Sequence, residues 1–524
     1  MGAIMAKRTA TAKAGALAAA LLGNLVIATT GSAQVLDPEQ RGPEPRGPQP
    51  LSTLQGCNLP LPGGAERDAG LAALHLRNRD GRPYLLTPSL TFRQTYSDNI
   101  TLSDSNKESD FVSQLIPAIS FCNVGRRVQV QADYRAELLK YWDDSSRDDV
   151  FQQANIGTRS EIIRERLFLD VDGSFGQEPI TTRGAFSSDN ALDTGNRADV
   201  ATYRFSPYFL QDLGPVGSSV TRYTYQRREG NRNTTNTTRQ SGSFLVTSPQ
   251  AAQPYSWQGS VQTQQVSQSN FRRDRYFDDA FIELGYFVRP RIQLIARGGL
   301  ETETRRDGTQ NRFGDEYWEA GFRYNDEKTR LEARYGQRFF GDTYFFSASR
   351  QTAIAVFQAS YRETQEISDR FFLSDEQFFI DFDPETGELD LIPLVDIEQE
   401  VFISKRANAS ATVRTGRSTI RLSGFHQRRE LIEANESTTN YGGDLFWRWQ
   451  WMPRTTLTPR VSWRRQEFRE GDSDTTRGIA VSAAHLLSPT MQGGVTLRRQ
   501  ERSSDRDGSD YTENAIIFEI TRVF

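Results

Sequence analysis

The strongest constraint on this chain is an alternation of apolar and polar residues that repeats, in segments of about ten residues, over residues 84–524. Residues 441–451 are the clearest example. Their apolar positions are Leu445, Trp447, Trp449 and Trp451, and their polar positions include Asp444, Arg448 and Gln450. Successive side chains of a β-strand point to opposite sides of a sheet, so this period predicts strands with one apolar and one polar face.

The connections between these segments sort into two alternating kinds. Short turns are expected near 122–126, 212–215, 289–291, 325–328, 415–417, 452–454 and 487–489. Longer polar stretches cover 97–110, 142–150, 177–199, 227–240, 302–314, 429–439, 468–477 and 500–510. Short turns that alternate with long outer loops are typical of transmembrane β-barrels.

The predicted fold class is therefore all-β, a single large transmembrane antiparallel up-and-down barrel of about 22 strands, with 20 strands as the alternative. Residues 362–400 interrupt the rhythm, and there we expect one extra strand over 371–382 and a long insertion. Beyond the first thirty or so residues no apolar run approaches the 18 residues of a membrane helix, and the mean hydropathy is −0.61. A helical membrane protein is excluded.

The N-terminus has the features of a secretory signal. Lys7, Arg8 and Lys13 precede an apolar run over 14–27, and a small-residue cleavage site ends at Ala33. The domain plan is then a cleaved signal peptide (1–33), a Pro/Gly-rich, mostly disordered periplasmic tether (34–83) and the barrel (84–524). The alternative for the first segment is a membrane anchor, for which the apolar run is short.

The last strand is expected to close the barrel against the first, so that no strand edge is left unpaired in lipid. Phe518, Ile520 and Phe524 share one face with Ile516. A terminal aromatic residue after alternating apolar positions is what the barrel-assembly machinery recognises in this class, although Arg522 departs from the usual pattern.

Composition limits the partners and the covalent chemistry. With 63 basic and 67 acidic residues the chain gives no support to nucleic-acid binding. Outer-membrane lipid and lipopolysaccharide are the expected surroundings. The two cysteines suggest a disulfide in an oxidising compartment: Cys57 of the tether would bond to Cys122 at the rim of the barrel.

A barrel of about 22 strands encloses a lumen too wide for side chains to fill, so it needs water or a plug. The tether, the 177–199 loop and the 362–400 insertion are the candidate plugs. Charged residues predicted to face the lumen are Arg204, Glu283, Arg297, Glu319, Arg323, Arg421, Asp444 and Arg448. Rows of such charges either guide a hydrated polymer or hold the wall rigid as Arg–carboxylate pairs.

Enzymatic chemistry has little support. Of the three histidines, His426 and His485 fall on the predicted lipid face at opposite ends of the barrel, and His75 precedes the barrel. The acidic segments 143–149, 472–474 and 505–510 are expected to be solvated hairpin tips, with divalent-cation binding as the alternative. Residues 505–510 share Asp-x-Asp-Gly with calcium loops but lack the helix context and the complete ligand spacing. We predict no enzyme activity, no cofactor and no metal site.

The opening of the predicted barrel resembles a known family. Thr95-Tyr96-Ser97-Asp98-Asn99-Ile100-Thr101-Leu102, followed by Asp110-Phe111 and Ile116-Pro117, is similar to the start of the outer-membrane β-barrel porins associated with PEP-CTERM/exosortase systems and exopolysaccharide loci. The match covers about 25 residues. The resemblance implies a barrel that works with exopolysaccharide export components. The alternative is an ordinary strand end, with Tyr96 at the membrane interface and Asp98-Asn99 starting a turn.

Three hypotheses follow. The first is a porin-like channel linked to exopolysaccharide export or surface assembly. The second is a structural or assembly barrel with a plugged lumen and no transport. The third is a soluble periplasmic β-protein.

Overall fold

A computed structural model describes residues 84–180, 183–185, 187, 189–231, 236–249, 252–269, 274–305, 312–313, 315–366, 380–382, 389–391, 402–431, 437–468 and 471–524. The predicted signal peptide and tether, with Cys57 and His75, lie outside these residues.

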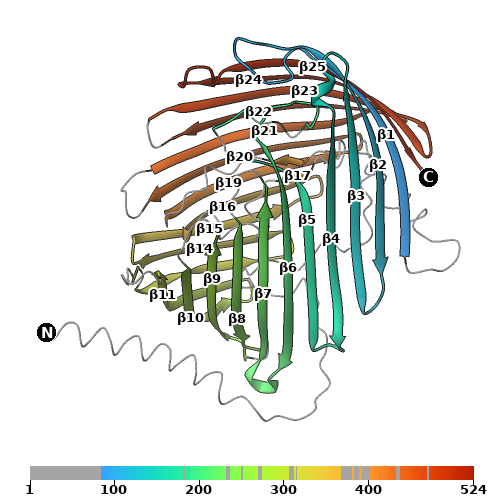
Figure 1. Ribbon diagram of the computed structural model, residues 1–524. Helices are drawn as coiled ribbons and strands as arrows, with labels where there is room; N and C mark the ends of the chain where they lie inside the picture. The colour runs from blue at the N-terminus through green and yellow to red at the C-terminus, as the bar shows by residue number, and fades with distance from the viewer. Residues whose placement is uncertain are drawn as a thin grey trace.

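Strands dominate the described chain (Figure 1). They are β1 (Tyr84–Ser97), β2 (Asp110–Val124), β3 (Val128–Tyr141), β4 (Asp149–Ile163), β5 (Leu167–Pro179), β6 (Arg197–Asp212), β7 (Ser218–Gly230), β8 (Thr237–Thr247), β9 (Tyr255–Gln268), β10 (Arg275–Arg289), β11 (Ile292–Arg305), β12 (Arg312–Phe313), β13 (Glu316–Asn325), β14 (Thr329–Arg338), β15 (Gly341–Gln351), β16 (Ala355–Glu366), β17 (Ile380–Phe382), β18 (Leu389–Leu391), β19 (Phe402–Thr415), β20 (Ser418–Leu431), β21 (Ser437–Met452), β22 (Thr455–Glu467), β23 (Ser473–Ser488), β24 (Met491–Ser504) and β25 (Tyr511–Val523). Two 3-10 turns are η2 (Ser145–Arg147) and η3 (Gly214–Val216).

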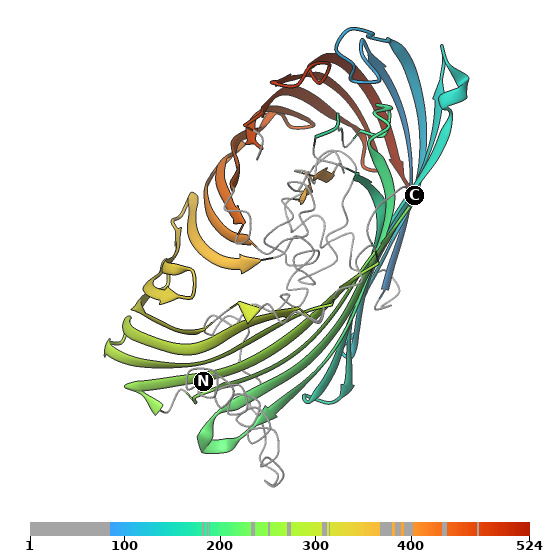
Figure 2. The same cartoon turned by 60° about the vertical axis from the view of Figure 1, so that its left-hand side comes forward.

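Twenty-two of these strands form one closed antiparallel barrel, which confirms the predicted fold class. Each wall strand pairs with the next one along the chain, and β1 closes the ring against β25 from Ser89↔Val523 to Ser97↔Ala515. Figure 2 shows the wall as an elongated ring. The alternative of a soluble β-protein is therefore wrong, because the sheet closes on itself and, as described below, its outer surface is apolar.

Of the extra strand predicted over 371–382 the structure describes residues 380–382, and these do not belong to the wall. Within the described residues, Ile380–Phe382 pairs only with Leu389–Leu391 in a separate two-stranded sheet. In the wall, β16 pairs directly with β19, from Ala355↔Val413 to Glu366↔Phe402. The barrel reaches 22 strands without that segment.

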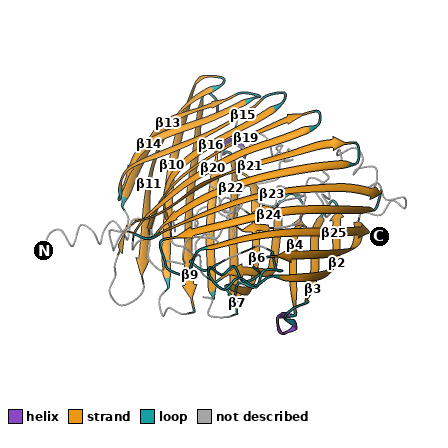
Figure 3. Cartoon of the chain, turned by 90° about the horizontal axis from the view of Figure 1, so that it is seen from above, coloured by secondary structure: helices purple, strands orange, loops and turns teal. Residues whose placement is uncertain are grey.

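Connections differ between the two ends of the barrel (Figure 3). We call them the short-turn end, where β10–β11 and β19–β20 are joined by two residues each, and the long-loop end, where β1–β2 and β5–β6 are joined by longer segments. One connection departs from the predicted rule. At the long-loop end only Phe339 and Phe340 separate β14 from β15.

The short turn between β13 and β14 shows how sequence fixes such a connection. The Tyr324 hydroxyl donates to Asp326 Oδ2 at 2.6 Å, and the backbone N–H groups of Lys328 and Thr329 donate to Oδ1 at 2.8 and 2.6 Å. These three bonds lower the pKa of Asp326 to about 2. A side chain that accepts bonds from its own turn is the usual role of Asp at such positions.

The outer face of the wall is apolar and exposed. Ile282 and Leu284 are each 60% exposed and Leu422 is 58% exposed, far more than leucines and isoleucines of a water-soluble core. So continuous an apolar surface requires an apolar environment.

Aromatic side chains gather at both ends of this outer face. At the long-loop end Tyr335 contacts both Trp318 and Tyr344, and at the short-turn end Trp447 stacks on Trp449. From Tyr441 to Trp451 a strand rises about 33 Å, or about 25 Å along the barrel axis at a tilt of about 40°. That height matches the lipid-facing band between the aromatic girdles of transmembrane barrels.

Among the described residues, the helical segments are single 3-10 turns, and none is long enough to span a membrane.

Candidate functional site: the lumen and its strap

The inner face of the wall carries charged side chains in pairs that bridge neighbouring strands. Arg204, predicted to face the lumen, is 7% exposed and lies 2.6 Å from Asp172 across the β5–β6 ladder. Next to it Asp170 accepts from both Arg159 (3.1 Å) and Arg222 (3.2 Å). Each guanidinium is thus compensated by a carboxylate from a nearby strand, as burial requires.

A larger network covers β10–β14. Glu283 accepts from Arg297 at 2.6 Å and from Arg323 at 2.7 Å. Glu319 accepts from Arg338 at 2.7 Å, and Arg338 also reaches Glu301 at 2.6 Å. Four of the residues predicted from sequence thus meet in one network.

Aromatic rings cover parts of this network. The guanidinium of Arg297 lies 4.2 Å from the ring centre of Phe281, that of Arg334 lies 4.0 Å from Phe345, and that of Arg338 lies 4.5 Å from Tyr317. A guanidinium over an aromatic face gains electrostatic attraction in addition to packing. This part of the inner wall is therefore a packed, charge-compensated layer.

The remaining predicted lumen charges lie on β20 and β21. Asp444 accepts from Arg460 Nε at 2.8 Å. Thr419 pairs in register with Arg448 and Ser423 with Asp444, so Arg448 and Asp444 share the inner face. Arg421 lies opposite Phe446 on that face and is exposed.

The connection between β5 and β6 folds into the lumen. We call its described residues, 183–185, 187 and 189–196, the strap. Ala191 and Leu192 are fully buried against Leu139 and Tyr141 of β3 and Tyr511 of β25. Figure 2 shows this segment inside the ring of strands. Of the three candidate plugs predicted from sequence, 177–199 therefore contributes a segment that lies within the barrel.

Polar bonds fix the strap to the wall on both sides of the β1–β25 closure. Asp189 pairs with Arg498 of β24 at 2.9 Å, and the Asn190 side chain donates to Glu137 of β3 at 2.8 Å. Arg502 of β24 donates to the carbonyl oxygens of Arg183 and Gly184, both at 2.8 Å.

Arg197, where β6 begins, organises the strap itself. Its guanidinium donates to the backbone carbonyl oxygens of Asp189 and Leu192, each at 3.2 Å, and to those of Ser187 and Asn190 at 3.5 Å. A fixed cation that gathers several carbonyl groups satisfies buried acceptors that would otherwise lack donors. The strap is therefore an ordered part of the lumen wall.

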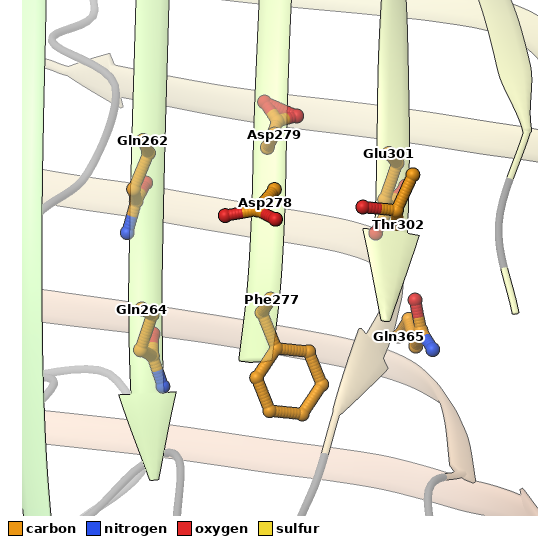
Figure 4. A pocket seen from close by; sticks show the side chains of 8 residues that line it. All are labelled: Gln262, Gln264, Phe277, Asp278, Asp279, Glu301, Thr302 and Gln365. Atoms are coloured by element: carbon orange, nitrogen blue, oxygen red, sulfur yellow. The ribbon is translucent and has the colours of Figure 1, made fainter. Parts of the chain in front are cut away.

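The end of β16 also turns into the lumen. Its ladder with β15 ends at Phe345↔Arg362, while its ladder with β19 continues to Glu366. Gln365 then lines the same cavity as Glu301 of β11, although three wall strands separate β16 from β11. Strands β9, β10, β11 and β16 enclose a cavity of about 10 Å³ lined by Gln262, Gln264, Phe277, Asp278, Asp279, Glu301, Thr302 and Gln365 (Figure 4). That is room for one water molecule.

The C-terminal residues singled out in the sequence lie on the outer face of β25 and just beyond it. Phe518, Ile520 and Phe524 are 54%, 50% and 64% exposed. The backbone N–H of Phe524 donates to Pro88 of β1 at 3.0 Å, and Arg522 lies 5.0 Å from the Phe524 ring centre. The last residue thus takes part in barrel closure.

Cys122 is 2% exposed near the end of β2, at the short-turn end. Its predicted partner Cys57 lies outside the described residues, so the disulfide stays a prediction.

The histidines and acidic loops have local partners. His426 packs against Tyr441 near the long-loop end, whereas His485 Nδ1 bonds to Thr455 Oγ1 at 2.9 Å near the short-turn end. In the 143–149 loop, Asp148 accepts from Lys140 Nζ and from the backbone of Tyr141, which lowers its pKa. Among the described residues no group of three or more His, Cys, Asp or Glu side chains forms a metal-binding cluster.

Sequence reasoning missed the strap anchors Arg498 and Arg502. They share the inner face of β24 with Gln492, Gly494 and Thr496, and this period was readable in residues 491–504. Their partner Asp189 had no such signal, because a loop has no fixed side-chain period.

The chain matches no protein-family model and no curated protein. Several solved structures are similar in shape. The ferric enterobactin receptor PfeA of Pseudomonas aeruginosa has a TM-score of 0.48 at 10% identity, covering 84% of this chain and 80% of that chain. The siderophore receptor PirA of Pseudomonas aeruginosa has 0.44 at 11%, covering 84% and 80%. The FrpB iron transporter of Neisseria meningitidis has 0.44 at 9%, covering 84% and 82%. At these values the similarity supports no statement about what this chain binds.

Proposed function

We propose that this protein is a non-catalytic outer-membrane channel for hydrated polar solutes, with the strap as its constriction. The observation that carries the proposal is the contrast between the two faces of one closed wall. The outer face exposes Ile282 and Leu284, while the same strand directs Glu283 inward to Arg297 and Arg323. A wall that is apolar outside and charged inside suits a wet passage through lipid.

Localisation is the first test. A barrel in the outer membrane is expected in the membrane fraction and should migrate differently on a gel before and after heating. Recovery of the exported protein in the detergent-free periplasmic extract would contradict both localisation and channel.

Conductance is the second test. The purified barrel in a planar bilayer should conduct ions, and removal of strap residues 183–196 should raise the conductance of a single channel. A barrel that inserts but does not conduct in either form would support the alternative function, a structural or assembly barrel with a closed lumen. The ion pair and hydrogen bonds that hold the strap inside the lumen favour this alternative, so it is the second candidate function.

The link to exopolysaccharide export rests on the resemblance of residues 95–117 to porins of PEP-CTERM/exosortase systems. Because the inner charges are paired, we expect them to orient a neutral or anionic polymer without tight binding. Loss of the gene should lower the amount of secreted polysaccharide, and an unchanged amount would remove this part of the proposal. The barrel-assembly machinery is the expected partner of β25, with Phe524 at its end.

A further inference from the structure

The outward-facing charge at the long-loop end is divided between two sides of the barrel. On β19–β24 the outward basic residues there are Lys405, Arg428, Arg465, Arg477 and Arg499, and the acidic ones are Glu430, Glu467 and Glu501. We call these outward-facing charged residues of β19–β24, five basic and three acidic, the basic rim. On β6–β15 the corresponding acidic residues are Asp199, Glu229, Asp278, Glu316 and Asp342, and Arg227 is a basic side chain among them. If all sides of the barrel faced the same surroundings, basic residues would have no reason to gather on one side and acidic residues on the other.

Strand register sets the basic rim among aromatic side chains. His426 pairs with Tyr441 and Tyr441 with Arg465, so the three form one row across β20–β22. Trp463 pairs with Arg477 in the next row. The ring centres of Tyr441 and Trp463 are 5.6 Å apart.

The basic rim lies at the level where the outer face changes from polar to apolar. Toward the short-turn end, the next outward side chains are Val461 on β22, two residues beyond Trp463, and Ile479 on β23, two residues beyond Arg477. They are 45% and 54% exposed. Arg465, Tyr441 and Trp463 are thus placed where lipid headgroups meet acyl chains.

The intramolecular partners of Arg465 and Arg477 leave the charges of these two residues available. Arg465–Glu467 is 3.4 Å and Arg477–Glu501 is 3.9 Å, and their side chains are 40% to 62% exposed. Exposed pairs of this kind contribute little. The basic rim contains two more basic than acidic side chains, and this net positive charge favours an anionic ligand.

We propose that the basic rim binds the phosphorylated headgroup of an outer-leaflet lipid. Arg465 and Arg477 present planar forks that match a phosphate group, and Tyr441 and Trp463 lie beside them against the glycan or the upper acyl chains. The site is on the lipid side of the wall, so it does not depend on transport through the lumen.

The test uses the full-length barrel in a neutral detergent, titrated with bisphosphorylated lipid A and observed by native mass spectrometry. Each basic residue near an anionic lipid contributes roughly a fivefold gain in affinity. The double variant Arg465→Gln/Arg477→Gln should therefore bind about thirtyfold more weakly. The charge-retaining variant Arg465→Lys/Arg477→Lys should keep most of the affinity, and Arg227→Gln on the acidic side should be unchanged.

Dephosphorylated lipid A is the decisive comparison. It should bind the wild-type barrel as weakly as bisphosphorylated lipid A binds the double Gln variant. Equal binding of the two lipids by the wild type, or equal affinity of wild type and double Gln variant for lipid A, would overturn the proposal. Heat-dependent gel mobility verifies that every variant is folded, and channel conductance, measured separately, tests the lumen alone.

Discussion

Arg498 of β24 forms a buried ion pair with Asp189 of the strap, 309 positions earlier in the chain. The same guanidinium donates to Glu513 of β25 at 2.9 Å, and Glu513 is fully buried. One wall arginine therefore joins the lumen segment to the last strand of the barrel.

Asp189→Asn should release the strap while leaving the wall folded. Arg498 keeps Glu513 as a partner, so the loss is expected to be about 3 kcal/mol, at the lower end for a broken buried pair. Trypsin cleavage after Arg183 in the strap should become faster, and the conductance should rise. Asp193→Asn is the matched control, because Asp193 is about half exposed and lies 3.8 Å from Arg147. Equal cleavage of the two variants would contradict the assigned role of Asp189.

Attachment of the strap should depend on pH. Burial opposes ionisation of Asp189, but Arg498, Arg93 and the backbone N–H of Ala191 outweigh it and hold the pKa of this carboxyl below its ordinary value. A carboxylate with a lowered pKa stabilises the folded state above its unfolded pKa, near 3.9, and loses this as pH falls through the folded pKa. The strap should therefore stay attached from neutral pH to about pH 4 and loosen below that. Conductance measured against pH should show this step in the wild type and lack it in Asp189→Asn; the same step in both would assign it to another group.

Most of the wall could be predicted from the sequence, because a lipid-facing strand imposes a strict period of two. Leu445 and Trp447 lie on the exposed outer face as predicted, and the turns near 289–291 and 415–417 are where the pattern stops. The described part of the extra strand predicted over 371–382, residues 380–382, lies outside the wall, because a short apolar alternation is equally compatible with a strand there.

The lumen was predictable only in part. The period of the strand predicts that Arg297 points inward. That Glu283 is its partner depends on the register between β10 and β11, which is fixed by the short turn and not by composition. The strap and the inturned end of β16 depend on contacts between elements far apart in sequence, such as Asp189 with Arg498. No local pattern encodes contacts of that kind.

The β6–β7 turn should tolerate a methyl group at one glycine and not at the other. Gly217 has φ +135°, and a Cβ there would lie 1.9 Å from the carbonyl oxygen of Thr247. Gly214 has φ +62° with nothing within 4 Å. Gly214→Ala should cost about 1 kcal/mol from backbone strain alone, whereas Gly217→Ala should cost roughly 3 kcal/mol or more. Urea unfolding in lipid vesicles measures both, and equal losses would argue against the close approach of Thr247.

The disulfide between Cys57 and Cys122 should form in the exported protein. Cys122 is buried at the short-turn end, the side from which the tether is expected to enter. Non-reducing digestion and mass spectrometry should give one linked peptide pair, which disappears in Cys122→Ser. Alkylation of both cysteines without prior reduction would show that they are free thiols and would remove this link.

Glu283→Gln should destabilise the barrel more than any exposed ion-pair change. Glu283 is 3% exposed and its two oxygens accept from Arg297 and Arg323, so Gln removes the negative charge and leaves one oxygen for two buried guanidinium groups. Breaking such a pair costs about 3–5 kcal/mol. Glu229→Gln is the control, since Glu229 and its partner Arg227 are both 41% exposed and such pairs contribute at most about 1 kcal/mol. Both variants are compared by urea unfolding in lipid vesicles, with tryptophan fluorescence as the signal. If Glu283→Gln unfolds at the wild-type urea concentration, the β10–β14 network does not stabilise the wall, and its charges would then be available to a solute.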